Sequence, residues 1–428
     1  MSGRASGISR DSSSRIGANS VAPVSRPWLI DPSLAIPRAG LSWLAASLLL
    51  LSIGLVTVYS ASFYRALVRE VGEYHFLQQQ LLGAGLGLAA LFVASRIEPR
   101  RWIEFAPVAY LGTLLALVLV WSPIGLASGG AHRWIDLGVV GLQSSELSKV
   151  AIPLMIVWYL TRYGDLAGEQ TRLKVHVNIL LIGSLLLPVG LILLQPDLGT
   201  AAFILAVGFL VVLCSGVPIR YSAALGVLAS PLLIWQVYER WPVIVKRFEG
   251  MTNPDRVDQV RHALTAIRAG GLEGAGVGRG TEKTLYLFAE FSDFIFAVYA
   301  EETGLIGIAL LFVLYVALLL SGWRIIRACR DFHLRLLATA ITCNLIIQAL
   351  INLAVNTALA PTKGIALPFI SHGSTGLSIA LLQVGILLAI ARVSRRDPEY
   401  TVTAKPADRI GPVRRSTTGC TPLPEEGS

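Results

Sequence analysis

The residues best suited to chemistry lie between Gly270 and Glu302, in the second half of the chain. A glycine-rich run is followed there by Lys283, Glu290 and Asp293, and a long apolar segment begins directly after Asp293. An ionisable side chain at a membrane boundary is costly unless it is solvated or paired, so it indicates function by default. If this segment folds back on itself, Lys283 and Asp293 could bring a cation for a diphosphate and a carboxylate base into one cleft. The alternative for Asp293 is a helix N-cap, a position that suits aspartate.

A second polar cluster contains Arg133 beside Trp134, followed by Glu146 and Lys149. Arg133 is compatible with the aromatic belt of a membrane interface or with the phosphate of an anionic lipid headgroup. Glu146 and Lys149 are three residues apart and so share one helical face. We predict that they form a structural ion pair where the helix enters lipid.

Asp197 lies in a third cluster, between two apolar runs with almost no loop. Proline and glycine on either side break the helix there, so the carboxylate must face protein or water rather than lipid. The alternative reading is the cap of a tight turn.

The fourth cluster begins with Asn352 and Asn356 and continues through residues 361–376, which include Lys363 and Ser371. Prolines and glycines interrupt apolar sequence here, as in broken membrane helices that line a cavity. Lys363 has no obvious acidic neighbour in the sequence. It could snorkel to the membrane surface or bind an anionic substrate.

Composition requires that a membrane surround these clusters. Hydrophobic residues make up 54% of the 428 residues, charged residues only 15%, and the mean hydropathy is +0.63. A soluble protein of this size could not bury so much apolar surface. The net charge of +9 does not indicate nucleic-acid binding, because the arginines gather between apolar segments, as the positive-inside rule requires. The four cysteines show no zinc-binding or disulfide spacing.

Apolar windows of membrane-spanning length predict an all-α polytopic membrane protein with about ten transmembrane helices and both termini in the cytoplasm. The windows are 41–61, 77–95, 105–124, 147–162, 176–194, 198–215, 221–240, 294–322, 335–358 and 366–391. They form a membrane domain over residues 39–395, with a large extracytoplasmic loop at 241–293 between the seventh and eighth helices. Residues 1–38 and 396–428 are polar and predicted to be disordered cytoplasmic tails.

Taken in order, these motifs resemble the SEDS family of bacterial cell-wall polymerases (FtsW, RodA and SpoVE). The resemblance covers residues 41–395. The matching stretches are Arg133-Trp-Ile-Asp-Leu-Gly, Gln143-x-x-Glu146-Leu-x-Lys149, Gln195-Pro-Asp-Leu-Gly-Thr, Glu290-x-x-Asp293-Phe-Ile-Phe-Ala and Pro361-Thr-Lys-Gly-x-x-Leu-Pro-Phe-Ile-Ser371. The Pro-Thr-Lys-Gly tetrad is more similar to the division branch, FtsW, than to the elongation branch, RodA.

The resemblance implies a multi-pass peptidoglycan glycosyltransferase of the bacterial inner membrane, placed at the division septum. Such enzymes polymerise lipid II, an undecaprenyl-diphosphate-linked disaccharide-pentapeptide, and work with a class B penicillin-binding transpeptidase among other division proteins. The alternatives are a lipid II flippase and a non-catalytic scaffold of the division machinery.

The resemblance places the family's essential aspartate on Asp293 and its functionally important loop lysine on Lys363. We expect Asp293 to be the base and Arg133, Lys363 and Lys283 to hold the phosphates, with Mg²⁺ or Mn²⁺ as the candidate cofactor. The remaining expected substrate contacts are Glu290, Ser371 and Asp197. The chain departs from the family's pattern in two places: the histidine usually found just before the aspartate is absent, and His372 stands where a tyrosine is usual.

Overall fold

The computed structural model describes residues 35–128, 131–136, 138, 141–163, 171–216, 227, 230–231, 234–282 and 293–394. The two predicted tails lie largely outside the described residues, as do Lys283, Glu290 and half of the predicted seventh span, 221–240.

Among the described residues, five helices are long and apolar enough to cross a membrane: α1 (Arg38–Val68), α2 (His75–Arg96), α12 (Ile295–Ala328), α13 (Phe332–Asn356) and α14 (Ser374–Val393). The other long elements are α4 (Ala106–Leu119), α5 (Ser144–Tyr163), α6 (Thr171–Leu194) and α7 (Leu198–Cys214), and a short α3 (Pro99–Glu104) precedes α4. Every predicted window except 221–240 overlaps one of these helices. The last window began too early, because the apolar residues 366–373 belong to a loop before α14.

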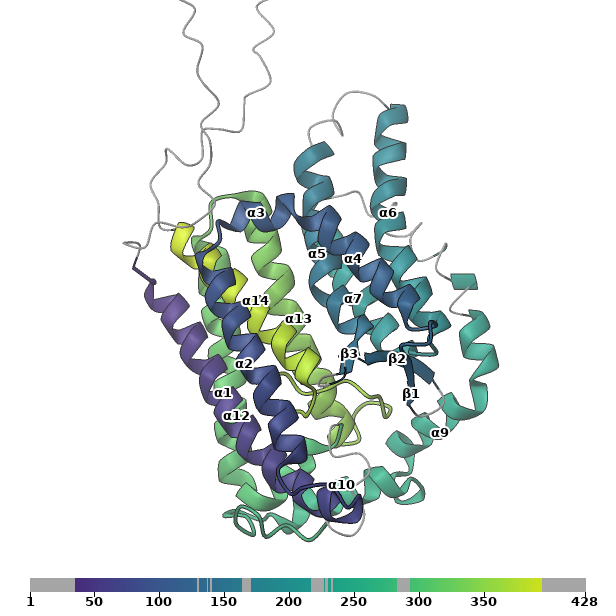
Figure 1. Ribbon diagram of the computed structural model, residues 1–428, viewed down its shortest axis with the longest axis vertical. Coiled ribbons are helices and arrows are strands. Elements are labelled where there is room, and N and C mark those ends of the chain that lie inside the picture. Colours follow the sequence, from purple (N-terminus) through teal and green to yellow (C-terminus); the bar gives the residue numbers. More distant parts are fainter. Residues whose placement is uncertain are drawn as a thin grey trace, which may run out of the picture.

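The helices form two groups that meet along α13 (Figure 1). In the first group, α14 packs along α2 and α1 packs along α12. In the second, α4, α5, α6 and α7 pack on one another. α13 contacts α5 and α7 as well as α12 and α14, so it joins the two groups.

The all-α prediction is wrong at one place, where a three-stranded antiparallel sheet precedes α5. Its strands are β1 (Gly125–Ser128), β2 (Ala131–Asp136) and β3 (Gly141–Gln143). Trp134 on β2 pairs with Leu126 on one side and Gln143 on the other. Strands of three to six residues are too short to register in windows of bilayer-spanning length, so hydropathy did not detect them. Arg133 is therefore held on a strand.

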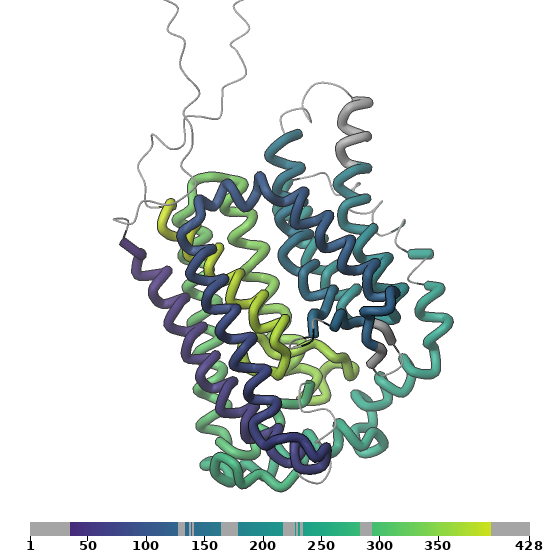
Figure 2. The backbone as a smooth tube through the Cα atoms, viewed as in Figure 1, coloured from purple at the N-terminus to yellow at the C-terminus, as the bar shows by residue number. Residues whose placement is uncertain are grey.

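The predicted extracytoplasmic loop is mainly helical from Trp241 to Ala269 and crosses one end of the bundle, opposite α3 (Figures 1 and 2). It contains α9 (Trp241–Thr252), the 3₁₀ helix η2 (Pro254–Arg256) and α10 (Asp258–Ala269). The buried residues Val260, Ala263 and Ala266 lie on one face of α10, which packs against α12. This helical pair places the glycine-rich run beside the first turns of α12.

The glycine-rich run binds α12 at a break in that helix. Gly304 has a φ of 62°, which interrupts helical geometry inside α12. The carbonyls of Glu301 and Glu302 then accept hydrogen bonds from the amides of Ala275 (2.9 Å) and Gly276 (3.0 Å). Because their own helix no longer satisfies these carbonyls, the loop supplies the missing donors.

The side chains of Glu301 and Glu302 are buried and tie this region to the rest of the bundle. The Glu301 carboxylate accepts from the Thr281 amide (2.6 Å) and hydroxyl (3.1 Å) and from the Glu282 amide (3.2 Å). Glu302 accepts from the Ser60 hydroxyl on α1 at 2.5 Å. The segment that leads towards Asp293 is thus fixed at its beginning.

We predict that Gly274→Ala destabilises the protein more than Gly278→Ala. Both glycines have positive φ (81° and 86°), so alanine is strained at each by about 1–2 kcal/mol. At Gly274 an added Cβ would also lie 2.3 Å from the Glu302 carbonyl oxygen, whereas at Gly278 it meets nothing within 4 Å. Thermal unfolding of the detergent-solubilised protein measures the difference. Equal melting temperatures for the two variants would show that the loop is not packed on α12 in this way.

Candidate functional site

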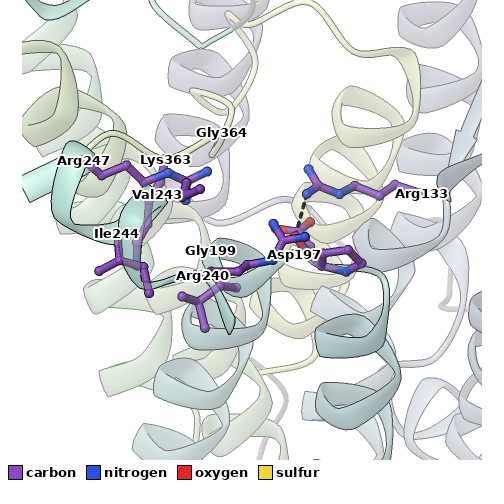
Figure 3. A pocket seen from close by; sticks show the side chains of 11 residues that line it. Arg133, Asp197, Gly199, Arg240, Val243, Ile244, Arg247, Lys363 and Gly364 are labelled. Atoms are coloured by element: carbon purple, nitrogen blue, oxygen red, sulfur yellow. Dashed lines mark hydrogen bonds between the residues drawn. The ribbon is translucent and has the colours of Figure 1, made fainter. Parts of the chain in front are cut away.

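A pocket of about 430 Å³ opens where α7, α9 and the loop after α13 meet (Figure 3). It is lined by Arg133, Pro196, Asp197, Leu198, Gly199, Arg240, Val243, Ile244, Arg247, Lys363 and Gly364. Three residues singled out in the sequence, Arg133, Asp197 and Lys363, are therefore brought together from parts of the chain far apart in sequence.

The turn before α7 fixes Arg133 and Asp197. The Arg133 guanidinium donates to the carbonyl oxygens of Pro196 (2.7 Å) and Gln195 (3.3 Å). Asp197 is the N-cap of α7, where its carboxylate accepts from the Thr200 amide at 3.1 Å. The turn-cap alternative for Asp197 is therefore correct, and the same residue also lines the pocket.

The described lining of the pocket carries four cationic side chains and one carboxylate. Burial lowers the pKa of Lys363, nearby Arg247 lowers it further, and Asp197 opposes the shift. Burial also lowers the pKa of Arg240, with Arg133 and Arg247 adding to the effect. Cations that lower one another's pKa repel one another, so they are stabilised when an anion binds among them. The pocket is therefore suited to a multiply charged anion such as a diphosphate.

Sequence reasoning missed Arg240 and Arg247. They flank the start of α9 and are seven residues apart, two turns of one helical face. The predicted boundary between the seventh span (221–240) and the extracytoplasmic loop (241–293) separates the two residues, so their shared helical spacing was not used. As a helix, α9 presents Arg247 to the pocket together with the apolar side chains of Val243 and Ile244.

Asp293 borders this pocket through Gly364. A Cβ added to Gly364 would lie 3.0 Å from the Asp293 Oδ2 atom, so the half-buried carboxylate lies against the backbone next to Lys363. The N-cap position of α12 is occupied by Phe294, and Asp293 precedes it by one residue. The predicted base is thus adjacent to the cations.

Ser371 is placed differently from the other expected contacts. Its hydroxyl accepts a hydrogen bond from the Leu367 amide at 2.7 Å, and the residue is buried. It closes a turn of the loop before α14 and does not line the pocket described above. Lys283 and Glu290 lie outside the described residues.

Glu146 and Lys149 lie in contact inside the bundle. Lys149 Nζ is 2.6 Å from Glu146 Oε1, and the two side chains are 9% and 4% exposed. Lys149 also donates to Gln348 Oε1 on α13 at 3.1 Å. This ion pair therefore links α5 to α13, the helix that joins the two groups.

Comparison with known proteins gives consistent matches over most of the chain. Residues 41–396 match a family described as "Cell cycle protein" that groups FtsW, RodA and SpoVE. The chain is 36% identical over 363 residues to a probable peptidoglycan glycosyltransferase FtsW of Geobacter sulfurreducens, covering 83% of this chain and 96% of that one. It is 33% identical over 355 residues to stage V sporulation protein E of Bacillus subtilis, covering 82% and 96%.

Solved structures of similar proteins share the fold. A chain of a peptidoglycan synthase complex that coordinates polymerization and crosslinking has a TM-score of 0.64 and 27% identity, covering 83% of this chain and 98% of that one. The rod shape determining protein RodA of Thermus thermophilus has a TM-score of 0.58 and 27% identity, covering 83% and 97%.

We predict that Glu146→Gln lowers the free energy of unfolding by about 3–5 kcal/mol, because it leaves the buried Lys149 ammonium without its anion. The double variant Glu146→Gln/Lys149→Met should regain most of this loss, since no uncompensated charge remains. Thermal unfolding in detergent measures both.

The control is Asp258→Asn, which breaks an ion pair of the same spacing with Arg261 whose side chains are 81% and 46% exposed. That change should cost no more than about 1 kcal/mol. If Glu146→Gln melts at the temperature of Asp258→Asn, the buried pair does not contribute as described.

Proposed function

This chain belongs to the FtsW, RodA and SpoVE family of cell cycle proteins, and from that premise we propose that it is a peptidoglycan glycosyltransferase. It polymerises lipid II into glycan strands during cell division, with a class B penicillin-binding transpeptidase as its partner. The observation that carries the proposal is the juxtaposition of a carboxylate, Asp293, with a pocket lined by four cations.

Glycan transfer from a diphosphate-linked sugar needs a base and an anion site next to each other. Asp293 takes the proton from the 4-hydroxyl of the acceptor sugar, whose oxygen then attacks the anomeric carbon of the donor. The bond from that carbon to the diphosphate breaks, and the diphosphate leaves with the electron pair. Arg133, Arg247 and Lys363 stabilise the charge that develops on the leaving group.

A divalent cation fits this site only in a limited way. Among the described residues there is no group of three or more histidine, cysteine or acidic side chains that could hold a metal. Among the described carboxylates, Asp197 lines the pocket and Asp293 lies against Gly364, which also lines it. Mg²⁺ or Mn²⁺ would therefore be held by one carboxylate together with the phosphates of the substrate, an arrangement that Mg²⁺ often adopts. It would supply additional positive charge at the leaving group.

The proposed topology has ten transmembrane helices, cytoplasmic termini and an extracytoplasmic loop over residues 241–293, in the inner membrane at the septum. The distribution of charge supports it. Helix α3, which carries Arg100 and Arg101, lies at the end of the bundle opposite α10 (Figure 1). Arg100 binds Asp331, the N-cap of α13, and Arg392 in the last turn of α14 donates to the Ser95 carbonyl near the end of α2. Arg96 and Arg327 stand in the last turns of α2 and α12, and Arg335 stands in the first turn of α13. An end rich in arginine is expected on the cytoplasmic side, which leaves the pocket facing outward.

We predict that Asp293→Asn slows polymerisation of lipid II by about 10²–10⁴-fold, the usual contribution of a general base. The purified protein and its transpeptidase partner are given lipid II, and glycan chains are resolved by gel. Asp258→Asn, an exposed carboxylate change on α10, is the control and should leave the rate unchanged.

The same preparations in liposomes separate the alternatives. Wild-type protein that moves lipid II across the bilayer but makes no chains would establish a flippase. Protein that does neither while still binding the transpeptidase would establish a scaffold. Either result would overturn the proposed activity.

We predict that the KM for lipid II begins to rise at a lower pH than it would if the pKa of Lys363 had its ordinary value. Lys363 must be protonated to attract the diphosphate, and its pKa lies below its ordinary value of 10.5. Affinity is therefore retained at low pH and lost as pH rises through that lowered pKa. Lys363→Arg should move the loss to higher pH, since guanidinium stays protonated. A wild-type KM that stays constant up to pH 10.5 would contradict a role for Lys363 in phosphate binding.

A further inference from the structure

Helix α13 carries four buried amide side chains at intervals of one turn, and the last three of them, Gln348, Asn352 and Asn356, bind backbone beside the site. Residues four apart lie on one helical face, so these side chains form a row that we term the amide ladder. The sequence marks them only as polar positions in an apolar helix. Buried amides are costly unless their hydrogen bonds are made, so their partners indicate what the ladder does.

The ladder binds the backbone that carries the predicted base. The amide groups of Asn352 and Asn356 both donate to the Asp293 carbonyl oxygen, at 3.0 and 3.1 Å. The side-chain oxygen of Asn356 also accepts from the Ala297 amide at 3.3 Å, in the first turn of α12. Asn352 and Asn356 therefore hold the backbone at the start of α12. Both bind the Asp293 carbonyl oxygen, and Asn356 also binds the Ala297 amide.

The ladder also binds the loop that carries Lys363. Asn352 donates to the Ile365 carbonyl oxygen at 2.8 Å, and Gln348 donates to the Ala366 carbonyl oxygen at 2.7 Å. Both acceptors belong to irregular backbone, so no helix satisfies them, and an unpaired buried carbonyl costs about 1–3 kcal/mol. Gln348 is held in turn by Lys149.

We propose that the amide ladder is the positioning device of the active site, setting the Asp293 carboxylate against Gly364 and the pocket cations. This inference rests on the proposed function. The three residues of the amide ladder contact different segments: Asn356 holds the Asp293 side, Gln348 holds the Lys363 loop, and Asn352 contacts both. Because Asn352 contacts both segments, it fixes the distance between the base and the phosphate site.

This division of contacts predicts different kinetic defects for three near-isosteric variants of the full-length protein with its transpeptidase partner. Asn356→Leu should lower kcat for lipid II polymerisation by about 100-fold with little change in KM, because misplacing the base affects only the reaction step. Gln348→Met should raise KM by about 10-fold with little change in kcat, because it loosens the phosphate-binding loop. Asn352→Leu should change both constants.

The matched control is Asn344→Leu, on the same helix and equally buried. The Asn344 amide donates to Gln383 on α14 at 2.7 Å and makes no contact with Asp293 or the Lys363 loop. It should lower the melting temperature as the ladder variants do, while kcat and KM per folded molecule stay within about twofold of wild type.

Backbone amide hydrogen exchange tests the same placement without requiring activity. Gln348→Met should speed exchange by about 10-fold in residues 361–373 alone, and Asn356→Leu in residues 293–297 alone. Asn352→Leu should speed exchange in both segments, and Asn344→Leu in neither.

The outcomes separate the two claims. If wild type makes no glycan chains, the proposed function fails, and the exchange pattern alone decides whether the ladder positions these segments. If wild type is active but the ladder variants show the constants of Asn344→Leu, the positioning role is overturned. Unchanged exchange in both segments of Asn352→Leu overturns it as well.

Discussion

Polar groups inside a membrane bundle must find partners within the protein, because lipid offers none. The site depends on this constraint, since its chemistry requires irregular backbone among packed helices. The turn at Gln195–Pro196 is bound by Arg133, the carbonyls freed at the Gly304 break are bound by the glycine-rich loop, and the loop after α13 is bound by Gln348 and Asn352. Each of these three breaks is satisfied by a specific donor, which favours one position of its backbone.

The pocket contrasts with these satisfied groups. Its cations are close enough to lower one another's pKa, and Asp197 alone among its lining residues compensates them. Without an anion, repulsion among these cations destabilises the protein. A bound anion relieves that repulsion, so the binding energy is concentrated where a diphosphate would lie. The Gln195 and Pro196 carbonyls hold the Arg133 guanidinium, so this cation is kept at the pocket whether or not an anion is bound.

Hydropathy was sufficient to predict the long apolar helices that the structure describes, because lipid demands long apolar segments and the chain supplies them. Arg133, Asp197 and Lys363 could be identified because charge is rare in such a sequence and therefore informative. The sheet around Trp134 could not, since its pairing is between short strands with no spanning length. Arg240 and Arg247 were missed because one ended a predicted span and the other lay in a predicted polar loop, where cations are ordinary until a helix aligns them. The Ser371 hydroxyl has the right chemistry to bind a ligand, but only the folded turn shows that it accepts a hydrogen bond from the Leu367 amide.

The site is divided between the two helix groups, and this division assigns the Glu146–Lys149 pair a wider role than local neutralisation. Arg133 and Asp197 belong to the group that contains α5 and α7, whereas Asp293 directly precedes α12 of the other group and Lys363 lies in the loop after α13, the helix that joins them. Lys149 on α5 binds Gln348 on α13, and Gln348 binds the loop of Lys363. The ammonium can donate to Gln348 in an apolar interior only because Glu146 balances its charge. A buried ion pair thus fixes one half of the phosphate site relative to the other.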